Sequence, residues 1–177
     1  MANFHEAYES TMKSEGGYVN DPDDPGGETY KGVARKHNSK WSGWITIDLL
    51  KQKANFPKNL DQDEELQREI ESFYEVNYWD KVQGDSIEDQ DVAESIFDFG
   101  VNAGPKTSAK LAQMSVSAEP DGIIGPKTLE KLNTEDKKTF LALFALAKIG
   151  RYVNICEKNS TSRKYFYGWV RRTLEGA

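Results

Sequence analysis

The chain has 177 residues, a net charge of −6 at pH 7 and an apolar fraction of 37%, including eight Phe, eight Tyr and four Trp. This composition supports a hydrophobic core and excludes a disordered chain. The acidic balance and the lack of clustered Lys and Arg argue against nucleic acid as the partner. The single cysteine, Cys156, excludes an internal disulfide and a cysteine-based metal site.

The N-terminal part is predicted to be a helix followed by a turn-rich acidic loop. Apolar residues recur at helical spacing over residues 3–14, and the glycine pair at 16–17 is a helix stop. Residues 20–27 read Asn-Asp-Pro-Asp-Asp-Pro-Gly-Gly and are dense in turn formers. Because Glu28 to Val33 can return from this loop as a short strand, we expect a small hairpin that carries the loop.

The remainder is predicted to be helical. The spacing of apolar residues indicates helices over residues 45–51, 63–78, 92–100, 108–114 and 163–174. The strongest helix is expected over residues 135–156, with Thr134 as its N-cap, and its nearly all-round apolar pattern indicates a buried central helix. We predict two parts, residues 1–90 and 91–177, packed into one compact unit, with residues 115–120 as the best candidate for a linker.

Several carboxyl groups in the N-terminal part could serve glycoside hydrolysis, which needs two of them on opposite sides of the scissile bond. Glu15 ends an amphipathic helix, where partial burial would favour the protonated form that a general acid requires. The loop beyond offers Asp21, Asp23, Asp24 and Glu28, one of which could hold or activate a water. A solvated glutamate at a helix end is the alternative interpretation, since glutamate is mostly exposed.

Metal sites and other hydrolase chemistries find little support in the sequence. The segment from Asp21 starts like an EF-hand, but Pro25 occupies its fifth position and Gly32 its twelfth, where calcium loops need ligands. Two histidines are too few for a zinc amidase, and no Gly-x-Ser-x-Gly motif occurs. We therefore expect neither a metal site nor a cofactor.

A long N-terminal motif resembles a known family. Residues 15–22 read Glu-Gly-Gly-Tyr-Val-Asn-Asp-Pro, and Asp24, Gly26-Gly27, Thr29 and Gly32-Val33 follow. This run resembles the signature of glycoside hydrolase family 108, which comprises muramidases related to phage endolysins. Further along, residues 99–104 resemble the substrate-cleft segment of phage-type lysozymes. Residues 121–128 and 168–172 resemble parts of the peptidoglycan-binding half of family members.

The resemblance implies a mainly α (α+β), lysozyme-like fold with a small N-terminal hairpin and acidic loop. It implies that residues 1–90 hold the catalytic part and residues 91–177 a peptidoglycan-binding region. The predicted site consists of catalytic Glu15, Asp24 and Thr29, and of substrate-binding Tyr30, Phe99 and Asn102. Asp24 stands nine residues after Glu15, as in phage-type lysozymes, but Thr29 follows five residues later, one fewer than in that type. The role of Thr29 and the choice between Asp24 and Asp21 therefore stay open.

Aromatic side chains in and after the motif have two interpretations. Tyr30, Trp41, Trp44, Tyr78 and Trp79 could stack on sugar rings, although aromatic residues more often fill a core.

The predicted function is hydrolysis of the β-1,4 bond between N-acetylmuramic acid and N-acetylglucosamine, with Glu15 as general acid and an inverting outcome. The cleft is expected between the acidic loop and residues 97–104. Two alternatives stay open. A non-catalytic peptidoglycan-binding protein would make Glu15 incidental, and a lytic transglycosylase would need the glutamate but no aspartate that activates water.

The expected partner is the glycan strand of bacterial peptidoglycan. No secretory signal is visible, and no apolar run approaches the ~20 residues that span a bilayer. We expect a monomer that is made in the cytoplasm, does not insert into a membrane, and reaches the wall through a holin or another release system.

Overall fold

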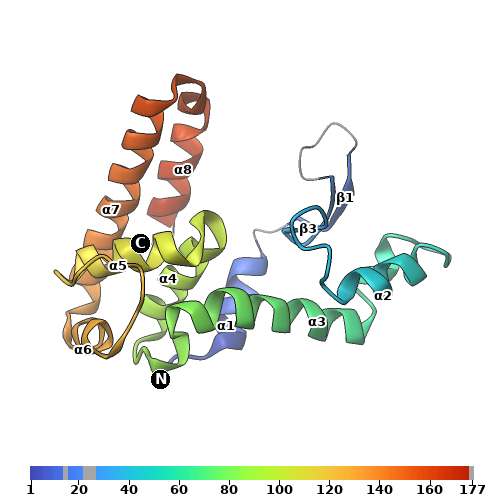
Figure 1. The fold of residues 1–177 in the computed structure, drawn as a ribbon, viewed down its shortest axis with the longest axis horizontal. Helices are drawn as coiled ribbons and strands as arrows, with labels where there is room; N and C mark the ends of the chain where they lie inside the picture. Colours follow the sequence, from blue (N-terminus) through green and yellow to red (C-terminus); the bar gives the residue numbers. More distant parts are fainter. Residues whose placement is uncertain (14–15, 22–26, 176–177) are drawn as a thin grey trace. The chain divides into compact units, whose positions relative to one another are not determined.

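The computed structural model describes residues 1–13, 16–21 and 27–175. The chain is mainly helical with one three-stranded antiparallel sheet near its N-terminus (Figure 1), which confirms the predicted fold class. It forms two compact units. We call Tyr8–Asn77 the sheet unit, and Met1–Ala7 together with Tyr78–Ala177 the helical unit. Helix α1 (Phe4–Met12) contributes residues to both.

The sheet has the strand order β1-β2-β3. β1 (Tyr18–Asn20) pairs with β2 (Glu28–Tyr30), and β2 pairs with β3 (Val33–Ala34). The single strand predicted from Glu28 to Val33 is therefore two strands. The reason is a two-residue turn in which Lys31 and Gly32 have φ of 43° and 79°, values that reverse the chain with the twist of a tight hairpin.

Helices α2 (Gly43–Leu50) and α3 (Glu64–Tyr74) support the sheet, with a short 3-10 helix, η1 (Lys58–Leu60), between them. The turn between β2 and β3 rests on α3, because the Tyr74 hydroxyl donates to the Lys31 carbonyl at 2.7 Å and the Lys31 ammonium donates to Gln67 at 2.7 Å. α3 continues as a π-helical segment, η2 (Glu75–Trp79). The buried core of the sheet unit includes Tyr30, Val33, Trp44, Ile47, Leu50, Leu60, Leu66, Ile70 and Tyr74.

The helical unit begins with two short 3-10 helices, η3 (Asp80–Val82) and η4 (Gly84–Ser86). The longer helices are α4 (Gln90–Ala103), α5 (Pro105–Ser115), α6 (Pro126–Thr134), α7 (Lys137–Lys158) and α8 (Arg163–Glu175), with η5 (Ser160–Ser162) between the last two. α4 runs past its predicted end at Gly100. It stops where Gly104 adopts a φ of 88° and Pro105 begins α5, as proline does at a first helical position.

Two aromatic clusters fill the helical unit. Phe4 packs against Trp79 and Phe97, with ring centroids 5.7 and 5.9 Å away. On the other side of α4, Phe99 meets the edge of Phe144 on α7, with centroids 5.8 Å apart. The Ser108 hydroxyl donates to the Ile96 carbonyl at 2.6 Å inside the core. α4 is therefore the element around which this unit is built.

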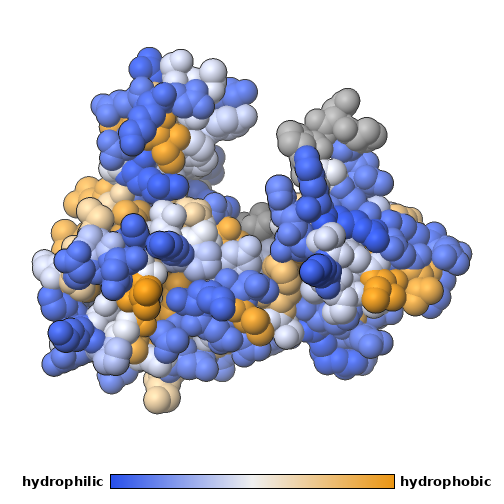
Figure 2. Space-filling model, in the orientation of Figure 1, coloured by the Kyte–Doolittle hydropathy of each residue, from blue (hydrophilic) through white to orange (hydrophobic). Residues whose placement is uncertain are grey.

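Helix α7 differs from its prediction in two respects. Its N-cap is Asp136, whose carboxylate accepts from the Thr139 amide at 2.9 Å, and Thr134 ends α6 instead. It is also not buried all round, since Leu146 is 64% exposed. Its C-terminal part pairs with α8 as a two-helix hairpin, and one partner cannot cover every face (Figures 1 and 2).

Helix α7 has 22 residues and is largely apolar. By length and composition alone this helix could cross a membrane, although the core helix of a soluble protein passes the same test.

Candidate active site

The sheet closes the base of the acidic loop. In the ladder, Asn20 at the end of β1 lies opposite Glu28 at the start of β2, so the two ends of the segment between them are neighbours. Asp21 is exposed at one of these ends. Two of the predicted catalytic residues, Glu15 and Asp24, lie outside the described residues.

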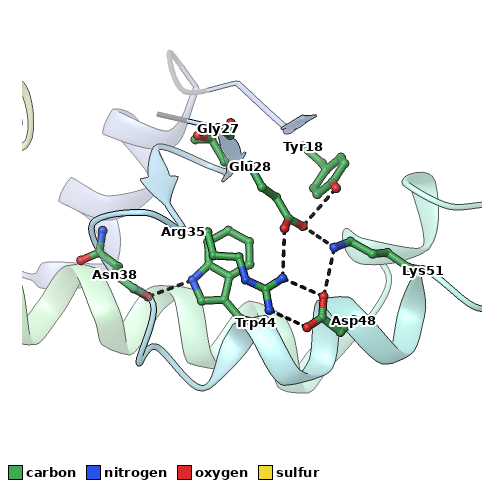
Figure 3. Close-up of polar contacts among 9 residues, drawn as sticks. Tyr18, Gly27, Glu28, Arg35, Asn38, Trp44, Asp48 and Lys51 are labelled. Carbon is green, nitrogen blue, oxygen red and sulfur yellow. Dashed lines mark hydrogen bonds and ion pairs between the residues drawn. The ribbon is translucent and has the colours of Figure 1, made fainter. Parts of the chain in front are cut away.

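Glu28 is the centre of a polar network that fastens the sheet to α2 (Figure 3). Its carboxylate accepts from the Tyr18 hydroxyl at 3.0 Å, from the Arg35 guanidinium at 3.0 Å and from the Lys51 ammonium at 2.6 Å. The Glu28 side chain is only 12% exposed. One carboxylate thus holds residues from β1, from the chain after β3 and from the end of α2.

Arg35 extends this network to Asp48 on α2 (Figure 3). Its two terminal nitrogens donate to the two Asp48 oxygens at 2.7 and 2.6 Å, which is the bidentate geometry that favours arginine over lysine. The guanidinium also lies 5.2 Å from the ring centroid of Trp44, whose indole N–H donates to the Asn38 carbonyl at 2.9 Å. This geometry sets the position of β2, the strand that follows the acidic loop.

The charges of the network keep its carboxylates ionised. Burial alone would raise the pKa of Glu28, but the hydrogen bonds from Lys51, Arg35 and Tyr18 outweigh it and leave that pKa below its ordinary value. The bidentate bond from Arg35 lowers the pKa of Asp48 in the same way. Glu28 is therefore an ionised carboxylate whose oxygens are already bonded to Lys51, Arg35 and Tyr18, and its role is structural. It suits neither a general acid nor a carboxylate that holds a water.

Thr29 lies on the other face of the strand. Side chains alternate along β2, so Thr29 points away from the face that carries Glu28 and Tyr30. It is partly exposed, it pairs with the exposed Val19, and its hydroxyl donates to the Gly27 carbonyl at 3.4 Å. A partly exposed hydroxyl next to the acidic loop can hydrogen-bond a water or a substrate.

The three predicted substrate-binding residues lie in different settings. Tyr30 is 1% exposed, and its hydroxyl bonds to Asp61 at 3.3 Å and to Gln67 at 3.0 Å. Phe99 is 2% exposed within the aromatic cluster of the helical unit. Asn102 is exposed on α4, and its amide donates to the Asp98 carbonyl at 2.8 Å. Tyr30 and Phe99 contribute packing in this structure, and the substrate contacts of all three stay predictions.

Sequence reasoning missed Arg35, Asp48 and Lys51. Asp48 and Lys51 stand three residues apart in and just after α2, which is a weak sign of a local ion pair. Nothing in the sequence linked them to Glu28, because a pairing across a hairpin and onto a helix depends on the tertiary fold. Over the described part of the chain, no group of three or more His, Cys, Asp or Glu side chains is placed to hold a metal ion.

Comparisons with known proteins agree with this architecture. The family model described as glycosyl hydrolase 108 matches residues 8–104, and a model described as a predicted peptidoglycan domain matches residues 104–174. Twelve chains of solved structures match. One of them, SagA from Brucella abortus, has 25% sequence identity and a TM-score of 0.62, with 97% of this chain and 94% of that chain covered. No curated protein matches.

The first family model spans more than half of the chain and includes the acidic loop and the whole sheet. The second spans most of the helical unit and supports peptidoglycan as the binding partner. The fold is lysozyme-like, as the sequence predicted. The chain therefore belongs to the glycosyl hydrolase 108 family and is a glycoside hydrolase that acts on peptidoglycan.

Proposed function

We propose that the protein is a muramidase that hydrolyses the β-1,4 bond between N-acetylmuramic acid and N-acetylglucosamine. Glu15 donates a proton to the glycosidic oxygen. Asp24 activates a water on the opposite face of the sugar, and the Thr29 hydroxyl orients that water. The observation that carries the proposal is the match to the glycosyl hydrolase 108 model over residues 8–104, which contains all three residues.

The ion-pair network supports this assignment by elimination. Among the acidic residues near the loop, Glu28 is committed to Arg35 and Lys51 and is unsuited to hold a water. The second carboxylate is therefore assigned to an aspartate of the loop, and the spacing of nine residues from Glu15 favours Asp24. The placement of Thr29, on the face of β2 away from the network, is consistent with its role beside that aspartate.

The proposed mechanism is inverting. Inversion needs the two carboxyl groups about 6.5–9.5 Å apart, so that a water fits between Asp24 and the anomeric carbon. A covalent glycosyl-enzyme intermediate would instead need a separation of about 5 Å. The pairing of β1 with β2 joins the two ends of the loop, and the resemblance to phage-type lysozymes favours the larger distance. The water oxygen bonds to the anomeric carbon as the bond from that carbon to the glycosidic oxygen breaks. The step leaves Glu15 ionised and Asp24 protonated, and proton exchange with bulk water restores both groups.

Conservative substitutions test the assignment. Glu15→Gln keeps the shape but cannot donate a proton, so lysis of purified walls should fall by roughly 10²–10⁴-fold. Asp24→Asn should be similarly severe, whereas Asp23→Asn is the matched control and should be mild. Thr29→Val should cost about tenfold, the loss of one hydrogen bond of about 1.4 kcal/mol, and Thr29→Ser should recover activity.

The outcomes separate the proposal from its rivals. Normal lysis by a folded Glu15→Gln variant would reject Glu15 as the acid. A severe Asp21→Asn effect with a mild Asp24→Asn effect would move only the second carboxylate. Anhydro-muramic ends in the products, detected by mass spectrometry, would identify a lytic transglycosylase. NMR of the freshly released anomer distinguishes inversion from retention.

A further inference from the structure

The surface of the sheet unit carries two adjoining hollows that the proposed catalytic residues do not line. Their volumes are about 470 Å³ and about 480 Å³, within the range of ligand sites. They share Trp41, Phe73 and Asn77, and we call the pair the Trp41 groove. The groove is formed by α3, by the start of η2 and by the segment that leads into α2.

The Trp41 side chain is fixed in place. A Cβ atom on Gly43 would come within 2.3 Å of the indole, so the ring packs directly on the backbone at a position where only glycine fits. Its other neighbours are Trp44 and Phe73, with ring centroids 5.3 and 5.8 Å away. A ring held in this way loses little rotamer entropy when a ligand binds.

Trp41 also keeps groups available to a ligand. It is partly exposed, whereas Trp44 and Trp79 are 2% and 0% exposed. Those two buried indoles donate to the Asn38 carbonyl and to Asp85. In the described part of the structure no group accepts from the Trp41 indole N–H, which leaves both a ring surface and a donor at the groove.

The rim of the groove is polar and balanced in charge. Neutral donors and acceptors from Asn38, Ser39, Ser42, Ser72 and Asn77 line it, together with two cations, Lys40 and Arg68, and two anions, Glu65 and Glu69. An aromatic platform bordered by such groups suits a pyranose ring. The C–H bonds of the sugar meet the negative face of the indole, and its hydroxyl and acetamido groups meet the rim. The balanced charge favours a glycan over the anionic stem peptide.

We propose that the Trp41 groove is a second glycan-binding site that takes β-1,4-linked N-acetylated amino sugars of the wall. The inference rests on peptidoglycan glycan as the substrate, but it does not depend on the catalytic roles of Glu15 or Asp24. A second site on the same chain raises the effective concentration of enzyme on an insoluble wall. It adds nothing to the cleavage of a short soluble strand that can occupy only one site.

The test measures binding of the full chain to purified sacculi by co-sedimentation at 4 °C, in a Glu15→Gln background that suppresses cutting. Trp41→Ala removes the platform, and Ser72→Arg blocks the groove from an exposed position without touching the core. The control, Gln52→Arg, adds the same charge at an exposed position outside the groove. Thermal melts establish that each variant is folded.

Both groove variants should bind sacculi roughly 3- to 10-fold more weakly, as expected for the loss of one aromatic contact, and Gln52→Arg should bind normally. In the Glu15-containing enzyme, Ser72→Arg should slow the digestion of sacculi and leave kcat on short soluble strands unchanged. Soluble N-acetylglucosamine tetramer should shift the NMR signal of the Trp41 indole N–H.

Unchanged sacculus binding by folded Ser72→Arg and Trp41→Ala variants would overturn the proposal. Binding to isolated stem peptides but not to amidase-stripped glycan strands would also overturn it. If Glu15→Gln still digests sacculi, the proposed catalytic role fails, while the binding comparison at 4 °C still decides the groove.

Discussion

Lys148 is a buried cation on α7, with 6% of its surface exposed. Its ammonium donates to the Ser95 hydroxyl at 3.0 Å and lies 4.4 Å from the ring centroid of Phe144. Burial lowers the pKa of this group to about 8, although the charge of Asp98 acts in the opposite direction. Burying this charged side chain therefore costs folding free energy, because the ammonium loses its hydration.

The pH dependence of this cost is a testable prediction. Below pH 8 both the folded and the unfolded chain carry the proton, so the full penalty of up to about 3 kcal/mol applies. Between pH 8 and about 10.4 the unfolded chain binds more protons, and stability from this group rises with pH. Lys148→Met should therefore stabilise the protein at pH 7 by roughly 1–2 kcal/mol, after the loss of the cation–π contact and hydrogen bond.

Urea unfolding of wild type and variant at several pH values checks this expectation. The advantage of Lys148→Met should shrink as the pH rises from 8 to 10, because the wild-type lysine loses its charge. Lys138→Met, at an exposed position on the same helix, is the control and should show no such trend. A difference between wild type and Lys148→Met that stays constant across this range would contradict the prediction.

At the scale of elements, the sheet depends on two helices for its position. It has only eight residues in three strands, too few to be stable alone. Contacts with α3 hold the turn between β2 and β3, and the Glu28 network holds the strands to α2. The strands that flank the acidic loop are thus held in position by side chains that take no part in the proposed chemistry.

Removing the charge of Glu28 tests whether this network stabilises the sheet unit. Glu28→Gln leaves Arg35 and Lys51 with a weaker partner in a partly buried setting, and should lower stability by about 1–3 kcal/mol at pH 7. The folded pKa of Glu28 lies below its ordinary value, so its contribution is present above the unfolded pKa and is lost as pH falls through the folded pKa. The difference between wild type and variant should therefore shrink below about pH 4.

Denaturant unfolding from pH 3 to pH 7 measures this difference. Glu64→Gln is the matched control, because Glu64 is 91% exposed and its pairing with Arg68 at 3.8 Å is worth little. Equal effects of the two substitutions at pH 7 would show that the network does not stabilise the sheet unit.

At the scale of the whole molecule, the family boundaries and the structural units do not coincide. The two family models meet at Gly104, but the helical unit runs from Tyr78 onwards and includes α4. Phe99 on α4 packs against Phe144, and Arg172 on α8 donates to Asp98 at 2.9 Å. A cut at Gly104 therefore passes through the middle of a hydrophobic core.

We predict that a fragment of residues 1–104 does not fold as the full chain does. Without α5, α7 and α8 it exposes the face of α4 that carries Phe99, which packs against Phe144 and Tyr152 of α7, at roughly 1.5–3 kcal/mol for a large side chain. Thermal unfolding followed by circular dichroism should show a sharp transition for the full chain and a broad one for the fragment. A cooperative fragment that lyses walls at the normal rate would refute this.

The amino-acid sequence by itself determined the family, the fold class and most helices of this protein. These depend on local information. Apolar spacing indicates a helix, and the run from Glu15 to Val33 is a contiguous motif. The assignment of peptidoglycan as substrate followed from that motif and agrees with both family models.

Only the tertiary structure decided which of several similar side chains form ion pairs and which are buried. Glu28 and the loop aspartates look alike in sequence, but Arg35 and Lys51 reach Glu28 only after the hairpin has folded onto α2. Likewise, Trp41 packs on the backbone of Gly43 and stays partly exposed, whereas Trp44 is buried. Burial and pairing arise from contacts between segments distant along the chain, and local sequence patterns carry no record of them.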